Sequence, residues 1–152
     1  MLPATNRRVA CHTSEAINQQ IAEETRQRVA HLATQGPEQI TRRLSELDYE
    51  WDIERALETN AATFALSGVI LGATVDRRWL LLPGLVTGFL LQHALQGWCP
   101  PLPLLRRMGF RTSAEINEER YALKALRGDF AQVAFRNGEY PNPQHALGAA
   151  GQ

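Results

Sequence analysis

Cys99 and His93 are the two residues of this sequence whose types and surroundings best suit chemistry. Cys99 follows a long uncharged segment directly and precedes two prolines. A thiol there could receive sulfur from a partner or form a disulfide. However, the partial negative charge of a helix C-terminus disfavours the thiolate, unless Arg106 and Arg107 fold back to offset it. The simpler interpretation of Cys99 is a small buried residue at a helix end.

His93 lies beside two side-chain amides, Gln92 and Gln96, and an antiparallel partner helix would add Asn60. Polar groups at membrane depth are candidates for function. One imidazole with amides, and no carboxylate three or four residues away, does not make a metal site. We therefore expect these four residues to form interhelical hydrogen bonds, with a substrate or proton path as the alternative. Cys11 and His12 are adjacent possible metal ligands, but with no further cysteine or histidine nearby in the sequence they also predict no metal site.

The composition excludes several classes of function. The 152 residues carry 16 basic and 16 acidic side chains, so the net charge of zero gives no support to a nucleic-acid partner. Two cysteines are too few for a disulfide framework. No catalytic signature is present, and we predict no enzyme, no catalytic residues, no cofactor and no metal.

Two uncharged segments must position these residues. Residues 59–75 carry no charge, Asp76-Arg77-Arg78 follow, and Trp79 opens a second uncharged run that passes Trp98. Seventeen residues of helix span about 25 Å, and the two tryptophans match the aromatic belts of a core roughly 30 Å thick. The pattern predicts an all-α protein with a two-helix transmembrane hairpin, flanked by N-terminal amphipathic helices and a C-terminal amphipathic helix. A re-entrant hairpin, or a soluble bundle that buries both segments, is the alternative.

Two glycine pairs with GxxxG spacing could bring the two helices together, since small residues permit close packing in lipid. An antiparallel hairpin with its turn near residue 78 would place Gly72 opposite Gly84 and Gly68 opposite Gly88. The same stripes could equally form a homodimer.

The rest of the chain divides by composition and periodicity into flanking segments. Ile40, Leu44, Leu47 and Trp51 fall on one helical face opposite an acidic face, so residues 40–58 are expected to meet another helix or a partner protein. The predicted segments are a disordered leader (1–12), N-terminal cytoplasmic helices (13–58), the membrane hairpin (59–110), a C-terminal helix (111–136) and a disordered tail (137–152).

Basic residues near the segment ends predict the topology. Arginines precede the first uncharged segment and follow the second, while Arg77 and Arg78 at the turn are partly offset by Asp76. This bias favours both termini on the cytoplasmic side, with Trp79, Trp98, Arg77 and Arg78 as interfacial anchors. We therefore expect a multi-pass protein of a bacterial inner membrane whose first partner is the lipid bilayer.

Residues 88–103, GFLLQHALQGWCPPLP, the following RRMGF at 106–110, and WDIERALE at 51–58 carry a resemblance. Over about residues 50–110 the chain resembles the YgaP-like transmembrane domain family, a short inner-membrane hairpin that in some members is fused to a rhodanese domain. The resemblance implies a two-helix membrane hairpin, often dimeric, and little about activity. Residues 1–58 are too few for a rhodanese domain and show no catalytic cysteine loop, so sulfurtransferase activity is not implied. The sequence thus predicts a structural or interaction module, with thiol or sulfur handling at Cys99 as the alternative.

Overall fold

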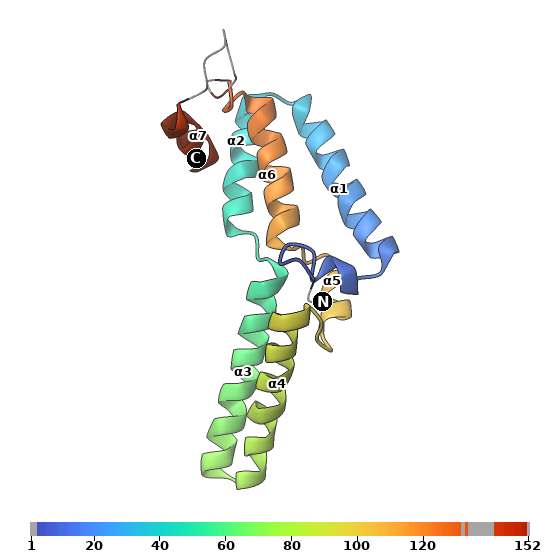
Figure 1. Cartoon of the computed structure of the whole chain (residues 1–152), viewed down its shortest axis with the longest axis vertical. Helices are drawn as coiled ribbons and strands as arrows, with labels where there is room; N and C mark the ends of the chain where they lie inside the picture. Colours follow the sequence, from blue (N-terminus) through green and yellow to red (C-terminus); the bar gives the residue numbers. More distant parts are fainter. Residues whose placement is uncertain (1–2, 132, 134–141, 152) are drawn as a thin grey trace. The chain divides into compact units, whose positions relative to one another are not determined.

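The computed structural model describes residues 3–131, 133 and 142–151, and all regular structure within them is helical (Figure 1). The predicted all-α class is therefore confirmed. The α-helices are α1 (Glu15–Ala33), α2 (Pro37–Tyr49), α3 (Ile53–Thr74), α4 (Leu81–Gln96), α5 (Leu102–Arg107), α6 (Ser113–Arg127) and α7 (Pro143–Gly151), and the short 3-10 helices are η1 (Ala10–His12) and η2 (Arg77–Leu80). The chain forms two compact units, one of residues 1–21 and 51–114 and one of residues 22–50 and 115–152.

A break separates α2 from α3, although no glycine or proline lies between Glu38 and Ser67. The backbone of Glu50 is extended, and the side chain of Asp52 accepts a 2.8 Å hydrogen bond from the Arg55 amide, which starts a new helix. Trp51 therefore leaves the predicted stripe and packs under the Arg55 guanidinium, 4.5 Å from its ring centre. The cap, rather than a glycine or proline, ends the periodicity of α2.

In the first unit, α3 and α4 lie side by side as an antiparallel hairpin closed by η2 (Figure 1). Its glycine register differs from the prediction. Gly68 packs on Pro83, and Gly72 packs on Leu80, whereas Gly84 and Gly88 are exposed with open space at their Cα atoms. Only the Gly68–Gly72 pair lies between the two helices. The second helix begins later than predicted, because η2 takes up residues 77–80, and this shifts the register of α4 against α3.

The two hairpin helices differ in length. Among the described residues, one stretch, Pro37–Thr74, which comprises α2 and α3, is long and apolar enough to cross a membrane, and core helices of soluble proteins also meet this criterion. α4 has 16 residues, about 24 Å of helix, which is less than the predicted run from Trp79 to Trp98. It is shortened by the η2 turn at its start and by left-handed Gly97, with φ +82°, at its end.

The predicted disordered leader is wrong for residues 3–12. Val9 is buried in a cluster with Ile53, Leu57 and Leu102, and η1 follows it. A single apolar residue has no periodicity, so its burial left no signal in the sequence. Residues 1 and 2 lie outside the described part.

In the second unit, the apolar face of α2 meets another helix, as predicted. Ile40, Leu44 and Leu47 are buried against Ile116 and Leu123 of α6, with Val29 and Leu32 of α1 packed at the edge. This face of α2 is therefore covered by the chain itself. Beneath it, the fully buried carboxylate of Glu119 accepts hydrogen bonds from Arg28 and Arg43.

The C-terminal part contains more order than predicted. α6 ends at Arg127, and the next residue, Gly128, has a φ of +90°, a left-handed conformation that suits glycine after a helix. Within the predicted disordered tail, α7 packs its last turn on α6, because buried Lys124 donates to the carbonyl of Ala150 at 2.9 Å. Residues 132, 134–141 and 152 of the predicted helix and tail lie outside the described residues.

Candidate functional site

A hydrogen bond between His93 and Glu54 joins α3 and α4 at the open end of the hairpin. The side chain of His93 is 3% exposed, and its Nε2 lies 2.8 Å from Oε2 of Glu54. Arg8 of the leader donates to the other carboxylate oxygen, Oε1, at 2.9 Å. The hydrogen bond from His93, aided by that from Arg8, holds the pKa of Glu54 below its usual range although burial opposes this. Because an ionised carboxylate only accepts hydrogen bonds, Nε2 must carry the hydrogen.

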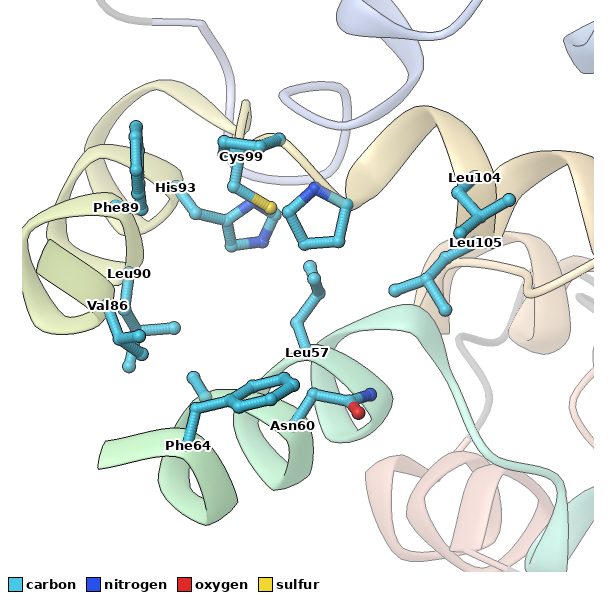
Figure 2. A pocket seen from close by; sticks show the side chains of 13 residues that line it. Leu57, Asn60, Phe64, Val86, Phe89, Leu90, His93, Cys99, Leu104 and Leu105 are labelled. Atoms are coloured by element: carbon cyan, nitrogen blue, oxygen red, sulfur yellow. The ribbon is translucent and has the colours of Figure 1, made fainter. Parts of the chain in front are cut away.

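Cys99 is brought to His93 by a sharp reversal after α4. Gly97 has a left-handed conformation, and the backbone of Arg8 packs against it. A Cβ at Gly97 would lie 2.4 Å from the Arg8 carbonyl oxygen, so the contact requires glycine. The chain then turns back, and the thiol of buried Cys99 lies beside the imidazole of His93 (Figure 2). The reversal within residues 97–100 thus brings the Cys99 thiol back against α4, the helix that the chain has just completed.

A pocket of about 560 Å³ opens beside this thiol (Figure 2). α3 contributes Leu57, Asn60, Ala61 and Phe64, and α4 contributes Val86, Phe89 and Leu90 together with His93. Cys99 and the two prolines after it, with Leu104 and Leu105 of α5, close the remaining side. The lining is apolar except where Asn60, His93 and Cys99 meet it.

A second, smaller pocket of about 260 Å³ lies on the other side of His93. Its lining includes the charged side chains of Arg8, Glu54 and Glu58 together with the apolar Leu57, Leu90 and Ala94. His93, Leu57 and Leu90 line both pockets, so the imidazole borders an apolar space and one that also contains charged side chains. Its second nitrogen, Nδ1, is buried and has no hydrogen-bond partner among the described residues.

The predicted polar cluster comes together only in part. His93 is buried, but its partner is Glu54 and not an amide. Asn60 donates to the carbonyl of Ala56 in its own helix, while Gln92 is half-buried and Gln96 exposed. Neither glutamine makes a side-chain hydrogen bond to another residue in the described ranges. The shifted register explains the difference, since it moves Asn60 away from Gln96.

The predicted interfacial anchors have different environments, and Arg106, a candidate partner of Cys99 in the sequence, lies elsewhere. Arg77, Arg78 and Trp79 are exposed at the turn, where Asp76 caps Arg78, whereas Trp98 packs half-buried against the core of the first unit. Arg106 does not serve Cys99: it is buried and donates to Thr13, Asn18 and the Phe110 carbonyl.

The sequence reasoning missed Glu54. It examined carboxylates near His93 along the chain, but the partner lies 39 residues earlier. With Gly68 opposite Pro83, the hairpin register places His93 near Glu58, one helical turn from Glu54. The sequence could have given this pairing only if the turn geometry of η2 had been known.

No family model, curated protein or solved structure matches this chain.

Proposed function

We propose that the chain is an integral membrane protein whose α3–η2–α4 hairpin inserts into a bacterial inner membrane and acts as a structural or interaction module. One observation carries this proposal: the hairpin is apolar on its outside. Beyond the first turns of α3, the buried residues of the two helices are Gly68, Gly72 and His93. The large apolar side chains face outward and are exposed at Phe64, Leu66, Val69, Ile70, Val75, Trp79, Leu80, Leu81, Leu85, Leu91 and Leu95.

This arrangement suits lipid and not water. Soluble monomers rarely expose a contiguous apolar surface of this extent, whereas membrane helices pack through small residues and present large ones to the acyl chains. Four hydroxyls of the hairpin also form hydrogen bonds within their own helices. Thr63, Ser67, Thr74 and Thr87 each donate to the carbonyl four residues earlier at 2.7 Å, which removes their need for water.

The proposal extends to topology. Both termini are placed on the cytoplasmic side, and α4 with η2 forms the shorter arm, either across the bilayer or as a re-entrant segment. Exposed Arg77 and Arg78 at the turn and the resemblance to the YgaP-like transmembrane domain family support an interfacial turn.

Carbonate extraction tests the membrane proposal. The protein is expected to stay in the membrane pellet at high pH. Val69→Arg on the exposed face of α3 should shift part of it to the supernatant, because an arginine at mid-membrane costs about 2.5 to 3.5 kcal/mol on insertion scales. Ala30→Arg, on the exposed face of α1, is the matched control and should change nothing. Release of the wild type by carbonate would contradict the proposal.

We also propose a homodimer as the preferred assembly. Gly84 and Gly88 lie exposed on α4 with the spacing of a packing stripe, and nothing in the described chain covers them. A second copy of the hairpin would use this face without disturbing the Gly68–Pro83 contact.

Thiol handling at Cys99 is the second candidate function, and the His93–Glu54 pair favours it. A thiol is reactive as the thiolate, and an imidazole that can take its proton raises the thiolate fraction. Glu54 orients the ring and stabilises the imidazolium, as the third group does in nucleophile–base–acid arrangements. These groups offset the unfavourable helix end.

Alkylation by iodoacetamide tests this second function. In a Cys11→Ser background, Cys99 is expected to react at least tenfold faster than in the same protein with His93→Gln, because the thiolate is the reacting form. Glu54→Gln should slow the reaction by a smaller factor. Equal rates in all three proteins would rule out an activated thiol.

A further inference from the structure

The pocket beside Cys99 has the properties of a site for one end of an apolar chain. Its volume of about 560 Å³ falls within the usual range of ligand sites. Leucine, valine, phenylalanine and proline side chains form most of its wall, and no lysine, arginine, aspartate or glutamate lines it.

The polar groups of the pocket gather at its end and match group transfer. Cys99 supplies a nucleophile, and beside its sulfur lies the imidazole of His93, which is 3% exposed and whose buried Nδ1 has no hydrogen-bond partner in the described ranges. A buried polar atom left unpaired is costly, so its retention points to a partner that is present during function. Asn60 adds an amide that can donate to a carbonyl oxygen.

The two pockets on either side of His93 fit the two halves of one donor molecule. The larger, apolar pocket suits an alkyl chain, and the smaller pocket offers the charged side chains of Arg8, Glu54 and Glu58 to a polar leaving group. A molecule with a long chain, a reactive carbonyl and a polar thiol carrier has this division.

We propose that this site binds a long-chain acyl thioester and transfers its acyl group to Cys99. The inference rests on the thiol function proposed above and names its substrate class. His93 Nδ1 takes the proton of the Cys99 thiol, and the thiolate attacks the carbonyl carbon to form a new C–S bond. The C–S bond to the carrier then breaks, and the departing sulfur takes the proton from His93. An acyl thioester and a cysteine thiol become an S-acyl cysteine and a free carrier thiol, with no change of oxidation state.

The test uses full-length protein in phosphatidylcholine nanodiscs with palmitoyl-coenzyme A as the probe and intact mass as the readout. The wild type is expected to gain one palmitoyl group that hydroxylamine removes. Cys99→Ser should abolish the gain, and Cys11→Ser, at the exposed cysteine, should not change it. His93→Gln should slow the gain by about a hundredfold, the size of a general acid–base contribution.

A paired substitution separates the pocket from simple partition of the probe into lipid. Ala61 lines the pocket, and its neighbour Ala62 is exposed and does not. Ala61→Trp should slow palmitoyl transfer at least tenfold but leave transfer from acetyl-coenzyme A unchanged, whereas Ala62→Trp should affect neither. Equal loss in both variants, or equal rates for the two probes in the wild type, would overturn the pocket's role.

The iodoacetamide reaction distinguishes failure of this inference from failure of the thiol function. If Cys99 reacts with iodoacetamide in a His93-dependent way but takes no acyl group, acyl transfer is ruled out and the activated thiol stands. If Cys99 reacts with neither reagent, both proposals fail. Palmitoyl-coenzyme A that binds without forming a thioester would also overturn the transfer.

Discussion

Replacement of Glu119 with alanine is expected to lower the free energy of unfolding of the second unit by about 3 kcal/mol. The Glu119 carboxylate is fully buried and holds two guanidinium groups, with Arg28 Nη1 at 2.9 Å and Arg43 Nε at 2.8 Å. Removal of one member of a buried ion pair leaves its partners without compensation. Arg43 is the more affected of the two, since its side chain is only 18% exposed.

Hydrogen exchange of the α6 amides in the full-length protein measures this loss. At 1.4 kcal/mol per tenfold change, 3 kcal/mol corresponds to a decrease in protection of about a hundredfold. Glu118→Ala is the matched control, because Glu118 is the preceding residue of α6 and is exposed. Unchanged protection in Glu119→Ala would mean that Arg28 and Arg43 are held by their other contacts.

The charge balance around Arg43 supports that expectation. Burial alone would lower the pKa of Arg43, but the hydrogen bonds to Glu119 and Glu46 and the charge of Glu50 raise it above its usual value. The guanidinium therefore stays charged in the partly buried setting. In the absence of Glu119, the charge of Arg43 would be balanced, among the described residues, only by Glu46 and Glu50. Both are more exposed than Glu119, so their ion pairs with Arg43 stabilise it less.

The helices of this protein could be predicted from the sequence, because the hydrophobicity of each segment and the spacing of its apolar residues indicate a helix without reference to the rest of the chain. The stripe of Ile40, Leu44 and Leu47 predicted a face of α2 that meets another helix, and α6 covers it. The two uncharged segments likewise predicted α3 and α4. Their ends were less certain, because Asp52 and Gly97 act through cap geometry and not through composition.

The contacts between distant parts of the chain could not be predicted in the same way. The glycine pairs gave no sign that Leu80 and Pro83 would occupy the helix interface in place of Gly84 and Gly88. That shift alone separates the expected amide cluster and places His93 near Glu54. Glu119 shows the same difficulty, because in the sequence it cannot be told from the exposed Glu118 beside it.

The close contact of Gly68 with Pro83 leads to the second large expected effect. A Cβ on Gly68 would lie 2.5 Å from Cδ of Pro83, whose ring cannot move aside, and 3.2 Å from the Trp79 carbonyl oxygen. Gly68→Leu must therefore push α3 and α4 apart, and overpacking of this kind costs about 3 kcal/mol at its upper range. The thermal midpoint of the hairpin in detergent, followed by circular dichroism, should fall sharply.

Gly88→Leu provides the matched control, since Gly88 has the same spacing in its helix but no atom within 4 Å of the added Cβ. It should leave the thermal midpoint near that of the wild type.

If the proposed homodimer uses the Gly84–Gly88 face, Gly88→Leu should lower the dimer fraction measured by light scattering, an effect that Gly84→Leu should share. Gly72→Ala should lie between the extremes, because the clash at Gly72 is with the flexible end of Leu80. Equal midpoints for Gly68→Leu and Gly88→Leu would contradict the register, since only one of these glycines lies between the helices.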